Sequence, residues 1–159
     1  MEVASDGAGR GSEFTIRLPR LAVDAPAPAA ARPAAWAAPS GPARRVLVVD
    51  DQPDSTDSLA LLLRLRGHEV STAADGPGAV DEFLRSKPEV VFLDLGLPGM
   101  SGYDVARRLR AMPERRDVRL VAVTGYGTEA DRERTRAAGF DLHLAKPVDP
   151  HAVEALLAS

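Results

Sequence analysis

The chain has 159 residues, a formal net charge of −3 and no cysteine. This length accommodates one ordinary domain plus additional segments. Without a basic excess the chain is not expected to bind nucleic acid, and without cysteine it forms no disulfide and uses no thiolate chemistry. No apolar run approaches the ~20 residues of a membrane span and no apolar signal core opens the chain, so we expect a cytoplasmic protein that makes no membrane contact.

The first 43 residues contain one predicted strand and one predicted linker. Residues 12–18 alternate apolar and polar side chains, which predicts a half-buried strand that Pro19 ends. A single strand requires a partner sheet, and the chain contains no obvious one. Alanine and proline dominate residues 22–43, and this composition predicts a disordered, semi-extended linker.

From Arg44 onward, short apolar runs alternate with segments of helical periodicity. The apolar runs predict strands over 46–49, 68–73, 89–94, 118–124 and 140–144. The periodic segments predict helices over 55–66, 75–86, 103–112, 128–138 and 149–158. Parallel strands require crossovers, and right-handed crossovers place helices on both faces of the sheet. The expected fold is therefore α/β, a doubly wound five-stranded parallel sheet in three layers.

Helical spacing also predicts which side chains of the helices face the sheet. For the first two helices these are Leu59, Leu62, Leu63, Leu65, Ala79, Val80, Phe83 and Leu84. Each of the two helices should therefore bury one apolar stripe and leave its other faces to solvent.

Polar side chains stand where several of the predicted strands end. Asp50 and Asp51 follow the first strand, Asp94 ends the third, and Thr124 ends the fourth. Lys146 comes shortly after the fifth strand. Because parallel strands all end at the same edge of a sheet, we expect these five residues to lie together, at the edge where open α/β sheets bind ligands.

Three neighbouring carboxylates repel one another unless a cation lies among them. Mg²⁺ prefers oxygen ligands and combines one or two carboxylates with phosphate oxygens, so Asp50, Asp51 and Asp94 predict a magnesium site. A carboxylate beside Mg²⁺ can attack phosphorus, and the Lys146 ammonium and Thr124 hydroxyl are suited to bind phosphoryl oxygens. No histidine lies among the strand-end residues, which argues against a Ser-His-Asp hydrolase.

Four motifs resemble the receiver domain of two-component response regulators. Residues 46–51 read Val-Leu-Val-Val-Asp-Asp, and residues 93–102 read Leu-Asp-Leu-Gly-Leu-Pro-Gly-Met-Ser-Gly. Residues 123–125 read Val-Thr-Gly, and residues 145–147 read Ala-Lys-Pro. The resemblance covers residues 44–159 and implies a flavodoxin-like receiver that takes part in phosphorelay signal transduction.

The resemblance implies a role for each strand-end residue. Asp94 is the expected phosphoacceptor, and the expected Mg²⁺ ligands are Asp50, Asp51, Asp94 and the backbone carbonyl of Gly96. Thr124 and Lys146 are expected to bind the phosphoryl group, and Pro147 resembles a cis-proline of the family.

Two further positions are expected to modulate the receiver. His143 stands where the family usually has an aromatic switch residue, three residues before the lysine. It is either a half-exposed strand residue or a switch that also responds to pH. Tyr126, two residues after Thr124, is expected to gate the site or a partner surface. Because Thr124 and Lys146 bracket residues 124–146, we expect the output of the receiver to involve that region.

The N-terminal residues 7–19 read Gly-Ala-Gly-Arg-Gly-Ser-Glu-Phe-Thr-Ile-Arg-Leu-Pro and resemble the last strand of a histidine-kinase ATP-binding domain. The implied organisation is a kinase remnant over 1–21, a linker over 22–43 and a receiver over 44–159, as at the C-terminus of a hybrid histidine kinase. The implied partner is a histidine kinase or a histidine phosphotransfer protein. The remnant lacks the ATP lid and the phosphorylated histidine, so no kinase activity is expected.

Two alternatives remain at this point. A Mg²⁺-dependent phosphohydrolase using Asp94 as nucleophile would typically need a second aspartate two residues later, where this chain has Gly96. An interaction module that is never phosphorylated would not need the complete set of strand-end residues. We therefore expect a phosphoaccepting module that is not a turnover enzyme and that catalyses only its own phosphorylation and dephosphorylation.

Overall fold

The structure is a computed structural model that describes residues 2–4, 7, 11, 13–15, 42–112, 117–125 and 129–158. The chain divides into an N-terminal unit, Met1–Ala37, and a larger unit, Ala38–Ser159. No helix within the described ranges is long and apolar enough to span a bilayer. Most of the predicted linker over 22–43 lies outside the described residues.

The N-terminal unit contains a two-stranded antiparallel pairing. Strand β1 (Glu2–Ala4) pairs with β2 (Glu13–Thr15), and Val3 lies opposite Phe14. The sequence predicted the second strand and no partner for it. The partner is the short segment that opens the chain, which is too brief for alternation of side chains to reveal.

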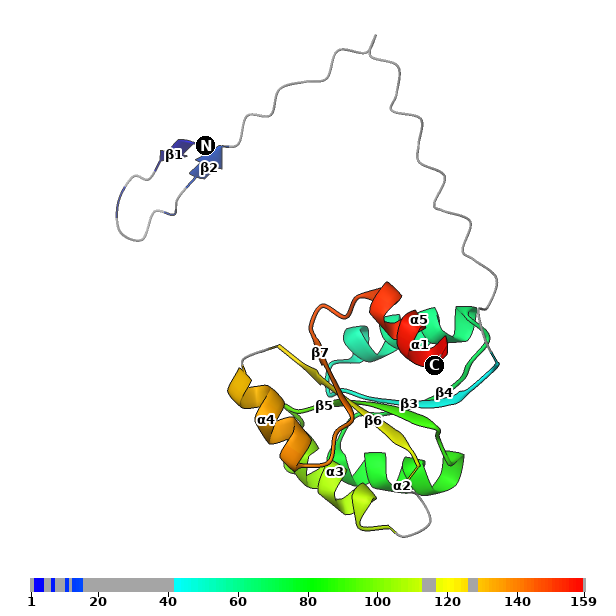
Figure 1. Ribbon diagram of the computed structural model, residues 1–159. Coiled ribbons are helices and arrows are strands. Elements are labelled where there is room, and N and C mark those ends of the chain that lie inside the picture. Colours follow the sequence, from blue (N-terminus) through cyan, green and yellow to red (C-terminus); the bar gives the residue numbers. More distant parts are fainter. Residues whose placement is uncertain are drawn as a thin grey trace. The chain divides into compact units, whose positions relative to one another are not determined.

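The larger unit is a five-stranded parallel sheet whose helices cover both faces (Figure 1). Its elements are β3 (Arg45–Val49), α1 (Pro53–Leu65), β4 (Glu69–Ala73), α2 (Gly76–Ser86), β5 (Val90–Asp94), α3 (Gly102–Arg110), β6 (Arg119–Thr124), α4 (Glu129–Ala137), β7 (Leu142–Ala145) and α5 (Pro150–Ala158). The strand order is β4-β3-β5-β6-β7, which is the flavodoxin-like doubly wound order. The predicted fold is confirmed, and the element boundaries differ by a few residues.

Two apolar layers hold the helices against the sheet. On one face, Phe83 of α2 and Leu109 of α3 pack against β3, β5 and β6, and Ala138, directly after α4, joins the same layer. On the other face, Leu63 of α1 and Leu157 of α5 complete the second layer. Each leucine or phenylalanine side chain fully removed from water contributes about 1.5–3 kcal/mol, so these two layers dominate the stability of the sheet.

The burial of Leu65 and Leu84 was predicted wrongly. Leu65 is 62% exposed and Leu84 is 51% exposed. Leu63 of α1 is buried, and a residue two positions further along a helix points to nearly the opposite side. Leu84 stands beside the buried Phe83 at the margin of the stripe on α2, so the helix turns it toward solvent.

Helix starts are set by side chains that satisfy free backbone N–H groups. The Asp75 carboxylate accepts a hydrogen bond from the Gly78 N–H at 2.7 Å and caps α2. The Ser101 hydroxyl accepts one from the Asp104 N–H at 3.3 Å and caps α3. Because these caps fix where each helix begins, they also fix the ends of the loops that connect the helices to the carboxyl ends of the strands.

Candidate functional site

The predicted strand-end residues meet at the carboxyl edge of the sheet. Asp50 follows β3, Asp94 ends β5, Thr124 ends β6 and Lys146 follows β7. These four strands are successive neighbours in the sheet. Asp50, Asp94 and Thr124 are 5%, 8% and 7% exposed, so their polar groups lie in a largely desolvated environment. The convergence expected from topology is therefore present in the structure.

Asp50, Asp51 and Asp94 form an acidic cluster. One carboxylate oxygen from each lies within 4.8 Å of the others. Asp50 and Asp94 are buried, whereas Asp51 is exposed and makes no hydrogen bond among the described residues. Ionised carboxylates at this spacing repel one another, and a cation placed among them relieves the repulsion.

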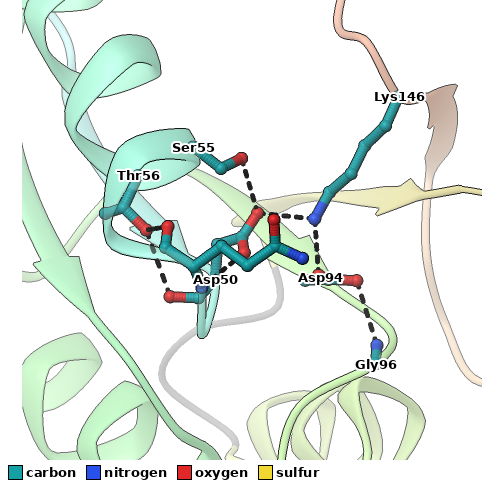
Figure 2. A network of polar contacts seen from close by, with 7 residues as sticks. Asp50, Ser55, Thr56, Asp94, Gly96 and Lys146 are labelled. Carbon is teal, nitrogen blue, oxygen red and sulfur yellow. Dashed lines mark hydrogen bonds and ion pairs between the residues drawn. The ribbon is translucent and has the colours of Figure 1, made fainter. Parts of the chain in front are cut away.

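Lys146 supplies a cation to this cluster. Its Nζ donates to Asp50 Oδ2 and to Asp94 Oδ2, at 2.6 Å in each case (Figure 2). Partial burial of the ammonium group alone would lower the pKa of Lys146, but hydrogen bonds and attraction from Asp50 and Asp94 outweigh burial and raise its pKa. Lys146 is therefore cationic at neutral pH, and it bridges a metal-ligand candidate and the predicted phosphoacceptor.

The Asp50 carboxylate is oriented by groups that the sequence analysis did not identify. The Ser55 hydroxyl donates to Asp50 Oδ2 at 2.9 Å (Figure 2). The Gln52 backbone N–H donates to Asp50 Oδ1 at 3.0 Å. Ser55 lies in the first turn of α1, which places its hydroxyl back toward the end of β3. A serine in the first turn after an acidic pair was the only available signal, and such serines are common without this role.

The Asp94 carboxylate is held by the loop that follows it. The Gly96 N–H donates to Asp94 Oδ1 at 3.0 Å, while Lys146 occupies Oδ2 (Figure 2). The Lys146–Pro147 peptide is cis, as the resemblance implied. The backbone N–H of Lys146 donates to the Thr124 carbonyl at 2.8 Å, so the ends of β6 and β7 are joined directly behind the site.

His143 lies on the same face of the sheet as Thr124. The register of β6 and β7 pairs Ala122 with His143, and alternate residues of a strand face the same side. Both ring nitrogens of His143 are enclosed and have no hydrogen-bond partner among the described residues. Tyr126, the other predicted modulator, lies outside the described residues.

The residues present fit a hard divalent cation. The cluster offers carboxylate oxygens only, which is the donor chemistry that Mg²⁺ prefers, and Asp51 is exposed to water. One bridging ammonium cannot neutralise three carboxylates, so a negative charge remains for a cation to balance. Zinc or copper would favour nitrogen or sulfur donors, which the cluster lacks.

Comparison with known proteins decides the family. Residues 46–158 match the response regulator receiver domain. The chain belongs to this family. The receiver is 44% identical over 102 residues to the sensory transduction protein RegX3 of Mycolicibacterium smegmatis, an alignment that covers 64% of this chain and 43% of that protein. The chain thus spans less than half the length of this relative.

Solved receiver structures share the fold at moderate identity. The receiver domain of the sensor histidine kinase PA1611 from Pseudomonas aeruginosa PAO1, which has a magnesium ion in its active site cleft, is 31% identical with a TM-score of 0.67, covering 73% of this chain and 95% of that one. The receiver domain of Ssk1 from Saccharomyces cerevisiae, in complex with the histidine phosphotransfer protein Ypd1, is 26% identical with a TM-score of 0.69. This match covers 74% of this chain and 88% of that chain. The receiver is therefore a signalling module of the two-component type.

Proposed function

We propose that this receiver accepts a phosphoryl group on Asp94 from a phosphohistidine, with Mg²⁺ held by Asp50, Asp51, Asp94 and the Gly96 carbonyl. The observation that carries the proposal is the position of Asp94, which shares one cluster with two further carboxylates and is hydrogen-bonded by Lys146 at 2.6 Å. The magnesium in the related PA1611 receiver supports the choice of metal. When bound, Mg²⁺ neutralises charge on the phosphoryl oxygens and on the carboxylates.

The transfer forms one bond and breaks one. An Asp94 carboxylate oxygen attacks phosphorus, the P–N bond of the phosphohistidine breaks, and the electron pair remains on the ring nitrogen. Because the other ring nitrogen of the phosphohistidine carries a proton, the leaving group is a neutral imidazole. The Lys146 ammonium lies beside Asp94 and pairs with the charged phosphoryl group in place of the carboxylate. The Thr124 hydroxyl, at the end of the neighbouring strand, donates to a phosphoryl oxygen. Later attack by water on phosphorus breaks the bond between the Asp94 oxygen and phosphorus, releases inorganic phosphate and returns Asp94 to the carboxylate.

The test uses a small phosphodonor. Incubation with acetyl phosphate and Mg²⁺ should add one phosphoryl group, about 80 Da, that intact-protein mass spectrometry detects. Asp94→Asn should abolish the adduct, whereas Asp81→Asn, at an exposed position of α2, should retain it. An adduct that forms without Mg²⁺, or that survives in Asp94→Asn, would refute the assignment. Continuous phosphate release from generic monoesters would instead favour a phosphohydrolase, which the glycine at position 96 disfavours.

We further propose that the output of the receiver involves residues 124–146. Thr124 and Lys146 lie at its two ends, and the hydrogen bond between their backbones links the ends of β6 and β7. His143 lies between them on the face of Thr124. Beryllofluoride with Mg²⁺ should shift the amide resonances of this region in NMR spectra. Unchanged resonances there, with clear shifts at Asp94, would contradict the proposal.

We also propose the domain division into a kinase remnant over 1–21, a linker over 22–43 and the receiver over 44–159, as in a hybrid histidine kinase. The Ala/Pro-rich composition and the N-terminal motif support this division. Limited proteolysis should release a stable fragment beginning near Arg44. In-frame kinase sequence upstream of this segment in the genome would support the hybrid origin, and an upstream stop codon would argue against it. The expectation that neither nucleic acid nor a membrane is a partner stays a prediction.

A further inference from the structure

The loop over residues 95–101, between β5 and α3, supplies the Gly96 amide that binds Asp94. The loop folds back on itself, because the Gly102 N–H donates to the Leu95 carbonyl at 3.2 Å and the Met100 N–H donates to the Pro98 carbonyl at 2.9 Å. The position of the loop therefore decides whether Gly96 can reach Asp94.

Met100 of this loop packs against the first residue of α2, a helix that contributes no side chain to the acidic cluster. That residue is Gly76, which is buried. A Cβ atom at Gly76 would lie 2.6 Å from Met100 Cβ, 3.0 Å from its Cγ and 3.1 Å from its Sδ. Because the nearest of these atoms is Met100 Cβ, no rotation of the methionine side chain can relieve the overlap. Any side chain at Gly76 must therefore displace the backbone of the loop or the start of α2 relative to it.

We propose that Gly76 is a positioning residue for the metal and phosphoryl site. Its missing side chain lets Met100 pack directly against the start of α2, and this contact holds the loop in the position where Gly96 binds Asp94. The inference rests on the proposed function, in which Asp94 and Gly96 ligate Mg²⁺. A purely structural role for Gly76 would change stability and leave the affinity for Mg²⁺ unchanged at temperatures where the protein is folded.

Gly76→Ala tests the contact, and Gly78→Ala is the matched control in the same helical turn. A Cβ at Gly78 would lie 3.0 Å from Asp75 Oδ1, which is the end of a flexible side chain, and 3.8 Å from both Asp75 Cγ and Ala73 Cβ. Mg²⁺ titration followed by the amide resonances of Asp94 and Gly96 gives the affinity of each folded protein. Gly76→Ala should bind Mg²⁺ about 10-fold more weakly, as is typical when a group that orients a metal ligand is lost, whereas Gly78→Ala should match the wild type.

A double-mutant cycle separates this contact from other effects. Met100→Gly removes the atoms that the methyl group introduced by Gly76→Ala would meet, so the double variant should bind Mg²⁺ no more weakly than Met100→Gly alone. If Gly76→Ala does not fold, Met100→Ala tests the same contact from the loop side and should itself weaken Mg²⁺ binding.

Three results would count against the proposal. Wild-type affinity in Gly76→Ala would overturn it, as would additive losses in the cycle. Wild-type affinity in Met100→Ala, where Gly76→Ala does not fold, would overturn it equally. In each of these cases the proposed function stands, because the wild type still binds Mg²⁺. Absence of saturable Mg²⁺ binding in the wild type would instead refute the proposed metal site, and this inference would fall with it.

Discussion

Gly102→Ala should destabilise the receiver, although alanine is the better helix former. Gly102 is the buried first residue of α3, and a Cβ there would lie 2.2 Å from the Asp94 carbonyl oxygen, 2.8 Å from Leu95 Cα and 3.0 Å from the Asp94 carbonyl carbon. All three are backbone atoms at the end of a central strand, where no side chain can rotate away. The Leu95 N–H also donates to the Val123 carbonyl at 3.3 Å, so a shift of this backbone would disturb the neighbouring strand as well.

Two opposing effects set how much Gly102→Ala changes the free energy of unfolding. Helix propensity favours alanine over glycine by at most about 1 kcal/mol. Overpacking of a well-packed site typically costs about 1–3 kcal/mol, and contacts this short with backbone atoms place the cost at the upper end or above it. We therefore expect Gly102→Ala to lower the free energy of unfolding by about 2 kcal/mol or more, the overpacking exceeding the gain in propensity.

Urea denaturation followed by circular dichroism measures this difference. Gly125→Ala is the control, because a Cβ there would meet no atom of the described residues within 4 Å. Its free energy of unfolding should stay within about 0.5 kcal/mol of the wild type, as for ordinary surface changes. If Gly102→Ala unfolded with the wild-type free energy or a larger one, the close approach of α3 to the end of β5 would be wrong.

Three further predictions concern polar groups. His143→Phe should raise the free energy of unfolding by about 1 kcal/mol in urea titrations, because it removes two enclosed nitrogens that lack partners among the described residues. A decrease would show that the His143 nitrogens are hydrogen-bonded. Burial and the nearby Arg44 charge lower the pKa of His68 below 6.5, so its neutral form contributes stability that is present above that pH and is lost as pH falls below it. Stability should therefore fall less steeply on acidification in His68→Gln than in the wild type, and identical slopes would contradict this. Lys146→Met should lower the free energy of unfolding by about 2 kcal/mol without metal, since its carboxylate partners are mostly buried but the ammonium is partly exposed. Millimolar Mg²⁺ should restore part of this stability in thermal unfolding. Equal stability of the variant and the wild type without metal would refute the bridge.

Much of the fold was predictable because its signals are local. Apolar runs bounded by turn residues marked every strand of the sheet, and periodic segments marked every helix. The prediction for Leu65 failed because it lies nearly opposite the buried Leu63 on α1, and the prediction for Leu84 failed because a leucine at the margin of a stripe is buried only if a neighbouring element covers it. Strand β1 was missed because three residues are too few to show alternation, so only its pairing with β2 identifies it as a strand.

The sequence predicted which residues meet at the candidate site, but it did not predict how they interact. Strand ends placed Asp50, Asp94 and Lys146 at one edge of the sheet, because parallel topology brings all strand ends together. The bridge from Lys146 to Asp50 and Asp94 depends on side-chain directions that a motif does not encode. The same holds for the hydrogen bond by which Ser55 orients Asp50.

The sequence by itself determined the order of strands and helices, the acidic and basic groups at the strand ends, and the family, because these depend on residue type and spacing along the chain. Only the tertiary structure decided that Lys146 bridges Asp50 and Asp94, that Met100 packs on Gly76, and that the His143 nitrogens are enclosed. The physical reason is range: periodicity is set by neighbours along the chain, whereas contact distances and burial are set by elements that meet only after the sheet and both helix layers have packed.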